Sequence, residues 1–178
     1  MRKKILVGVV GAVVGPVLLY AAVSSHLGNM RQVGDLVVDV TGKDGAGKEH
    51  SLSGLRGGPV LVFFYPRDDT PGCTKEACAF RDQWEKYTAA GVRVLGVSGG
   101  SEAGKRAFAD KYELPFPVIT DGDLEWARAF GVRVILGIPQ RVSFLLDSGG
   151  RVAKVYRDID VGLHADDVLR DARSLTQN

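Results

Sequence analysis

From residue 33 onward the chain alternates between two kinds of hydrophobic pattern. Short apolar or alternating runs, rich in β-branched and aromatic residues, predict strands at 36–40, 59–65, 91–97, 114–119, 142–146 and 151–156. Apolar positions at helical spacing predict helices from Cys73 to about residue 90 and at 101–111, 123–130 and 164–174. Strands and helices alternate at first, and the chain ends in a hairpin followed by a helix. This order predicts an α/β fold with a central mixed sheet flanked by helices.

A different pattern precedes this domain at the N-terminus. Three basic residues at positions 2–4 lead into a run of nineteen residues without a charge, at 5–23. A run of this length predicts one hydrophobic helix that can span a bilayer. The basic flank favours an orientation with the N-terminus in the cytoplasm and the remainder of the chain outside.

Two interpretations of this segment remain open. Residues 1–24 are either an uncleaved membrane anchor or a cleaved signal peptide, since Ala22 and Ser24 are small enough for a signal-peptidase site. Residues 25–32 form a polar linker, and residues 33–178 form the domain. Both interpretations predict an exported protein, located in the periplasm or on the extracytoplasmic face of the inner membrane.

The charge of the chain argues against a nucleic-acid partner. The chain has 23 basic and 21 acidic residues, and without the three N-terminal basic residues 20 basic residues face 21 acidic ones. A near-neutral domain lacks the electrostatic footprint of a nucleic-acid-binding protein. The histidines, His26, His50 and His164, are scattered without the spacing of metal ligands, so we predict no metal site.

The two cysteines, Cys73 and Cys78, are the only ones in the chain. Cys73 follows the predicted strand at 59–65 and a turn with two prolines, at the start of the predicted helix, where unpaired N–H groups and the helix dipole stabilise a thiolate. Five residues along a helix separate two Cα atoms by about 8–9 Å, beyond the ~7 Å limit for a disulfide. A bond between them therefore requires the helix to unwind, which a redox cycle allows and a permanent disulfide does not favour.

The sequence around Cys73 resembles a known active site. Pro66, Thr70 and Cys73 have the spacing Pro-x-x-x-Thr-x-x-Cys, and Thr70 begins the string Thr-Pro-Gly-Cys-Thr-Lys-Glu-Ala-Cys-Ala-Phe-Arg-Asp. Both features are similar to the peroxiredoxin family, in particular to its bacterioferritin comigratory protein, or peroxiredoxin Q, type. The resemblance runs from about residue 33 to the C-terminus and implies a thioredoxin-like fold. A proline that is usual in this type near residues 36–37 is absent here.

The resemblance implies a thiol-dependent peroxidase that reduces hydrogen peroxide and organic hydroperoxides. Cys73 would be the peroxidatic nucleophile, Thr70 would hydrogen-bond the thiolate and the peroxide, and Pro66 would shield the sulfur from water. Arg141, in the context Gly-Ile-Pro-Gln-Arg-Val-Ser-Phe-Leu-Leu-Asp, matches the arginine that the family recruits from a distant strand. A guanidinium stays charged and can donate two hydrogen bonds as a fork.

The resemblance also implies how the cycle closes. Cys78 would resolve the sulfenic acid of Cys73 through an intramolecular disulfide, which a thioredoxin-like dithiol protein would then reduce. No cofactor is implied, and the protein would be a monomer. Glu76 matches the family string as well, but we expect it to face solvent, and we expect His164 to begin a helix.

Other interpretations fit parts of the sequence. A thiol–disulfide oxidoreductase prefers Cys-x-x-Cys at the helix start, whereas this chain has Cys-Thr-Lys-Glu-Ala-Cys. A non-enzymatic peroxide sensor would use the same cysteine pair, and a structural disulfide is the default in an oxidising compartment. The run Gly-Val-Ser-Gly-Gly at 96–100 fits a nucleophile elbow with Asp147 and His164 downstream, but a domain of roughly 145 residues is short for an α/β-hydrolase.

Overall fold

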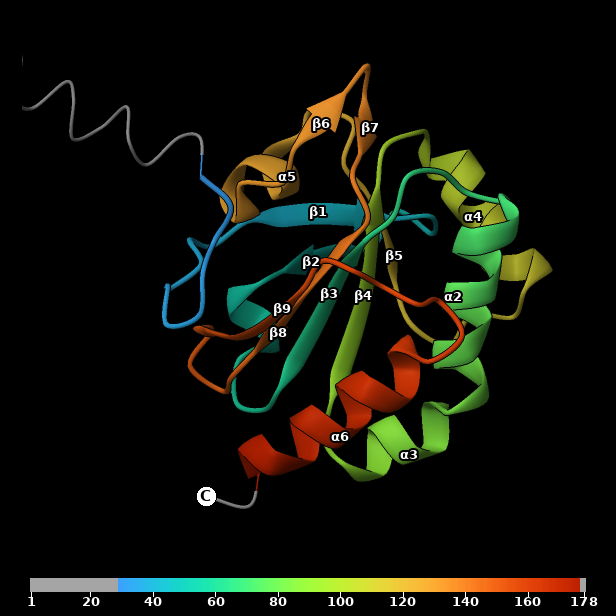
Figure 1. The fold of residues 1–178 in the computed structure, drawn as a ribbon. Helices are drawn as coiled ribbons and strands as arrows, with labels where there is room; N and C mark the ends of the chain where they lie inside the picture. The colour runs from blue at the N-terminus through green and yellow to red at the C-terminus, as the bar shows by residue number, and fades with distance from the viewer. Residues whose placement is uncertain (1–28, 177–178) are drawn as a thin grey trace, which may run out of the picture.

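The computed structural model describes residues 29–176 (Figure 1). The predicted hydrophobic helix at 5–23, and with it the anchor or signal peptide, lies outside these residues. Within 29–176, no helix is long and apolar enough to cross a membrane.

A seven-stranded mixed sheet forms the centre of the molecule, in the order β2-β1-β5-β4-β3-β8-β9. Its strands are β1 (Thr41–Asp44), β2 (Glu49–Ser51), β3 (Val60–Phe64), β4 (Arg93–Ser98), β5 (Val118–Thr120), β8 (Val142–Leu146) and β9 (Val152–Tyr156). The three middle strands β3, β4 and β5 run parallel, and the flanking strands pair antiparallel to them. The predicted α/β fold with a central mixed sheet is confirmed.

Helices cover both faces of this sheet (Figure 1). They are α2 (Pro71–Asp82), α3 (Trp84–Ala89), α4 (Glu102–Lys111), α5 (Glu125–Phe130) and α6 (His164–Thr176), with a 3₁₀ turn at Ser53–Leu55. Apolar residues of α2, α3, α4 and α6 belong to one core cluster, and those of α5 belong to the other. Strand β3 contributes alternate side chains to both clusters, with Phe64 on the α5 side and Phe63 on the α2 side. Burial on both faces explains why its sequence is a continuous apolar run.

The predicted first strand is wrong. Residues 36–40 are extended but carry only one isolated bridge, from Leu36 to Arg151, while β1 and β2 occupy positions at which the sequence predicts no strand. Val37 and Val40 are buried in the core without a strand ladder, so their apolar character does not mark a strand. The polar strand β1 instead gains its place through backbone pairing with β2 and β5.

Gly42 allows β1 to lie close to α5. A Cβ at this position would stand 2.6 Å from Nε1 of Trp126 and 2.7 Å from Cγ2 of Ile119, both on buried side chains. We therefore expect Gly42→Ala to lower the unfolding free energy by about 1–3 kcal/mol through overpacking. Gly122→Ala is the control, since its Cβ would approach nothing closer than 4.0 Å. Urea denaturation measures both, and equal stability of the two variants would contradict the expectation.

Three further elements differ from the predicted ones. The long helix predicted from Cys73 begins at Pro71 and is interrupted at Gln83, where α2 gives way to α3. Strand β5 is shorter than the predicted 114–119 because two prolines precede it and cannot donate to a ladder. A small hairpin of β6 (Val134–Ile135) and β7 (Ile138–Pro139) has no counterpart in the predictions. Its turn places Leu136 at a φ of 51°, a conformation that the sequence does not signal for leucine.

Candidate active site

The turn after β3 places Cys73 in the first turn of α2. Thr70 occupies the N-cap position, Pro71 follows as the first helical residue, and the Cys73 side chain is buried at 2% exposure. Proline suits this position because its fixed φ matches the helix and its missing N–H would be unpaired there anyway. The helical ladder begins with the bond from the Thr74 N–H to the Thr70 carbonyl, 2.8 Å. The Cys73 N–H therefore precedes the ladder and faces the end of the helix that favours an anion.

Arg141 brings a guanidinium to this sulfur. Its Nη2 lies 3.1 Å from Cys73 Sγ. Strand β8 begins at the next residue and pairs antiparallel with β3, with Val142 opposite Phe64, so the start of β8 and the end of β3 meet at one edge of the sheet. Gly72 lies beside the guanidinium, since a Cβ at this position would be in ordinary van der Waals contact with Nη2, at 3.5 Å. The fold thus brings the predicted site residues Cys73 and Arg141 into contact.

Glu76 lies beside Arg141, and the expectation that it faces solvent is wrong. Its side chain is fully buried, and Oε2 accepts a hydrogen bond from Arg141 Nη1. Positions 73, 76, 77 and 80 form one stripe on α2, and this stripe packs on the sheet. Burial raises the pKa of Glu76 to about 7, although the Arg141 charge acts in the opposite direction.

His164 and Ser143 extend this polar row behind Glu76. His164 begins α6, as the sequence predicts, but its ring is buried, with Nε2 2.9 Å from Ser143 Oγ and 3.9 Å from Glu76 Oε1. Burial lowers the pKa of His164 to about 4. No sequence motif indicates this contact. It arises because β8 and the start of α6 meet α2 on one side of the sheet.

The remaining predicted site residues lie near Cys73 in the chain but make other contacts. The Thr70 hydroxyl donates to the Arg67 carbonyl at 3.1 Å, and Pro66 is half-buried two residues after the end of β3. Cys78 is half-buried on the same unbroken helix as Cys73, and both are free thiols. Helical geometry keeps their Cα atoms about 8–9 Å apart, so the two thiols cannot bond in this conformation.

The serine of the candidate nucleophile elbow, Ser98, is a hydrogen-bond partner of a buried lysine. The Ser98 hydroxyl is buried and accepts a hydrogen bond from Lys105 Nζ at 2.6 Å. His164 contacts Ser143 rather than Ser98. These partners give Ser98 no histidine base.

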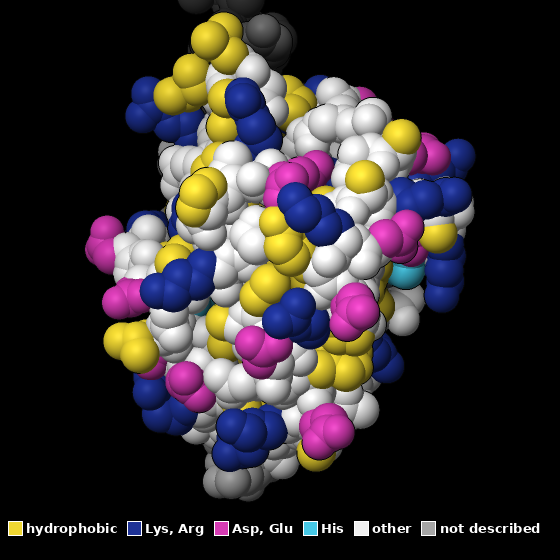
Figure 2. Space-filling model, turned by 90° about the vertical axis from the view of Figure 1, so that its right-hand side faces the viewer, with side chains coloured by type: hydrophobic (Ala, Val, Ile, Leu, Met, Phe, Trp, Pro, Cys, Tyr) yellow, Lys and Arg dark blue, Asp and Glu magenta, His cyan; other side chains and the backbone are white. Residues whose placement is uncertain are grey.

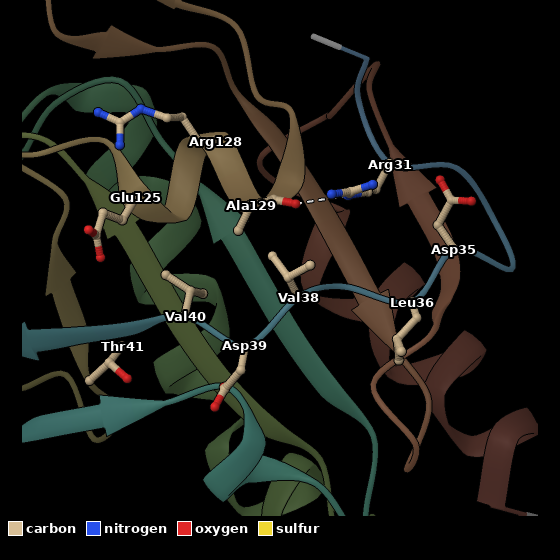
Figure 3. Close-up of a pocket in the computed structure, with 10 residues that line it drawn as sticks. All are labelled: Arg31, Asp35, Leu36, Val38, Asp39, Val40, Thr41, Glu125, Arg128 and Ala129. Atoms are coloured by element: carbon tan, nitrogen blue, oxygen red, sulfur yellow. Dashed lines mark hydrogen bonds between the residues drawn. The ribbon is translucent and has the colours of Figure 1, made fainter. Parts of the chain in front are cut away.

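A groove on the other side of the sheet is separate from this site. It has a volume of about 840 Å³ and lies between the extended N-terminal segment and α5 (Figure 3). Arg31 at its rim donates to the Ala129 carbonyl at 2.9 Å. Its lining residues include neither cysteine nor Arg141. On the side formed by α2 and α4, basic and acidic side chains are interspersed (Figure 2), and exclusion of a nucleic-acid partner stays a prediction.

Among the curated relatives of the chain are plant proteins. Peroxiredoxin Q, chloroplastic, from Sedum lineare is 44% identical over 136 residues, which cover 75% of this chain and 73% of the relative. The protein of the same name from Populus jackii is 44% identical over 136 residues and is covered to 64%. The predicted export to the periplasm or the outer face of the inner membrane is contradicted by these relatives, which are chloroplastic. Export signals and organelle transit peptides both carry basic residues and few acidic ones, so the basic flank of 5–23 does not fix a destination.

Solved structures and a family model agree with these relatives. Peroxidoxin BcpB from Mycobacterium tuberculosis has a TM-score of 0.77 at 33% identity, covering 82% of this chain and 98% of the other. Peroxiredoxin Q from Xanthomonas campestris has a TM-score of 0.73 at 31% identity, covering 81% and 96%. The AhpC/TSA family model matches residues 33–155. The chain therefore belongs to the AhpC/TSA family, as a peroxiredoxin of the peroxiredoxin Q, or bacterioferritin comigratory protein, type with the thioredoxin-like fold.

Proposed function

We propose that this thiol-dependent peroxidase uses Cys73 as its peroxidatic nucleophile and Cys78 as its resolving cysteine. The observation that carries the proposal is the Arg141 guanidinium 3.1 Å from a buried sulfur in the first turn of a helix. A fixed cation and the helix N-terminus both stabilise a thiolate, and the thiolate is the form of cysteine that attacks peroxides.

In the first step the Cys73 thiolate attacks the terminal oxygen of a hydroperoxide. The S–O bond forms, the O–O bond breaks, and the leaving alkoxide or hydroxide takes a proton from solvent to become an alcohol or water. Cys73 is left as a sulfenic acid. Arg141 and the Cys73 N–H would stabilise the negative charge as it moves to the leaving oxygen. The Thr70 hydroxyl would turn from the Arg67 carbonyl to hold the peroxide.

In the second step Cys78 attacks the sulfenic sulfur. An S–S bond forms, and the hydroxyl group of the sulfenic acid leaves as water. Because α2 is continuous between the two cysteines, its first turns must unwind for this step. A thioredoxin-like dithiol protein then supplies two electrons by thiol–disulfide exchange and returns both thiols. That the protein works as a monomer stays a prediction.

Intact mass of the reduced full chain after one equivalent of hydrogen peroxide tests these roles. We expect the wild type to lose two hydrogens quickly, Cys78→Ser to gain one oxygen, and Cys73→Ser to remain unchanged on the same timescale. Equal, slow reaction of all three proteins would contradict the assignment.

Two rival functions share the cysteine pair. A thiol–disulfide oxidoreductase would react slowly with peroxide and rapidly with disulfide substrates, whereas a peroxide sensor would react once without sustained turnover. Continuous NADPH consumption with thioredoxin and its reductase distinguishes the peroxidase from both. The spacing of the cysteines and the relatives favour the peroxidase.

A further inference from the structure

Two neighbouring carboxylates tie the loop before Cys73 to α4. Asp68 Oδ2 lies 2.7 Å from Lys105 Nζ, and the Tyr65 hydroxyl donates to Asp68 Oδ1 at 2.6 Å. Asp69 accepts hydrogen bonds from Lys111 and Tyr112, at the end of the same helix. The two ties differ in burial, because the Lys105 side chain is fully buried while that of Lys111 is 56% exposed.

The surroundings of Lys105 make the inner tie strong. Its ammonium group has three N–H donors, and Asp68, the Ser98 hydroxyl and the Gly99 carbonyl accept them at 2.7, 2.6 and 2.5 Å. Asp68 is the only one of these acceptors that carries a charge. Burial lowers the pKa of Lys105, and Asp68 acts against that change. Movement of Asp68 away from Lys105 would therefore leave a buried ammonium without a counter-charge, which is strongly unfavourable.

The Asp68–Lys105 ion pair affects the second step of the proposed cycle, in which the disulfide forms. The disulfide requires the first turns of α2 to unwind, and the unwound segment begins directly after the loop that carries Asp68. A segment tethered at Asp68 can adopt fewer conformations than one whose tether is released, so the tether lowers the population of the unwound state.

We propose that Asp68 and Lys105 form a buried latch that holds the loop before Cys73 and slows formation of the Cys73–Cys78 disulfide. Both are positioning residues, since neither touches the reacting sulfur. The latch prolongs the life of the assembled peroxide site. It also leaves the sulfenic acid more time to meet a second peroxide, which oxidises it to a sulfinic acid and is itself reduced to water or an alcohol. The inference rests on the Cys73–Cys78 cycle proposed above.

Rapid-quench intact mass on the reduced full chain separates the two steps. Sulfenic acid formation is measured in a Cys78→Ser background. Disulfide formation is measured in chains that retain Cys78, at peroxide concentrations high enough to make the first step fast, as the first-order loss of water from the sulfenic acid form. We expect Lys105→Met to raise the disulfide rate constant about tenfold, as loss of a buried ion pair allows, without raising the sulfenic acid rate constant. Less sulfinic acid should then accumulate at high peroxide. Asp68→Asn should act in the same direction, and the double variant Asp68→Asn/Lys105→Met, which leaves no unpaired charge, serves if Lys105→Met does not fold.

Two controls isolate the latch. Lys111→Met removes the exposed tie on the same helix and should change the disulfide rate constant less than about twofold. Leu146→Ala creates a cavity on the α5 side of the sheet and reports the effect of general destabilisation.

The outcomes separate the latch from the cycle on which it rests. A disulfide rate constant in Lys105→Met and Asp68→Asn that equals the wild-type value, or that rises no more than in Leu146→Ala, would overturn the latch alone. A wild type that forms no Cys73–Cys78 disulfide would overturn the proposed cycle and the latch with it.

Discussion

Arg141→Met is expected to lower the second-order rate constant for peroxide reduction by about 10²–10³-fold, the usual effect of removing one charge-stabilising donor from an active site. The guanidinium contacts the Cys73 sulfur at 3.1 Å, so it stabilises the thiolate before attack and the charge on the leaving oxygen afterwards. Methionine retains most of the side-chain length without the charge. Stopped-flow measurement of sulfenic acid formation in a Cys78→Ser background reports this step alone.

Two further variants separate the charge of Arg141 from its shape and from general effects. Arg141→Lys keeps a cation but loses the fork that binds Cys73 and Glu76 together, so its rate constant should fall between those of the wild type and Arg141→Met. Arg151→Met removes an exposed arginine that binds the Gly34 carbonyl and should leave the rate constant unchanged. A rate constant for Arg141→Met within threefold of the wild type would show that Arg141 does not assist the reaction.

Local motifs predict the parts of this site that lie close together in the chain. The spacing of Pro66, Thr70 and Cys73 is fixed by one turn and one helix start, which the structure reproduces. Arg141 is 68 residues away, and the resemblance finds it only because a strand of recognisable sequence follows it. Its position depends on the antiparallel pairing of β8 with β3, which periodicity alone does not specify.

The burial of Glu76 is indicated by its position along α2. Its spacing from Cys73, Ala77 and Phe80 places it on the buried stripe of α2. Charged residues are rarely buried without a partner, so the charge of Glu76 favours the opposite prediction. The partner that reverses it, Arg141, comes from a different strand. The burial of Lys105 is not predicted from the sequence for the same reason, because its counter-charge, Asp68, lies in the loop after β3.

At the predicted first strand, the apolar pattern indicates burial correctly but predicts the wrong secondary structure. Residues 36–40 are apolar enough to predict a strand, yet Val37 and Val40 only fill the core, while the polar β1 pairs with two neighbours. A strand is defined by its backbone partners, and side-chain periodicity reports only which face is buried.

Glu76 and His164 are expected to give the unfolding free energy opposite dependences on pH. The native pKa of Glu76 is about 7 against an ordinary value of 4.5, so between these values the folded protein holds a proton that the unfolded chain has released. Stability therefore falls as pH rises through this window, by up to about 3 kcal/mol. The native pKa of His164 is about 4 against 6.5, so the unfolded chain binds the extra proton and stability rises with pH by a similar amount.

These two contributions overlap between pH 4.5 and 6.5, where they cancel in the wild type. Glu76→Gln removes one of them and keeps a side chain that can still accept a hydrogen bond from Arg141. Its unfolding free energy, taken relative to that of the wild type, should rise by about 3 kcal/mol between pH 4.5 and 7, because only the wild type loses stability as Glu76 titrates.

The unfolding free energy of His164→Gln, taken relative to that of the wild type, should fall by a similar amount between pH 4 and 6.5. Taking differences removes the titration of groups that the substitution leaves unchanged. Urea denaturation at intervals from pH 4 to 8 measures both profiles, and a Glu76→Gln profile parallel to that of the wild type would mean that the pKa of Glu76 in the folded protein equals its ordinary value.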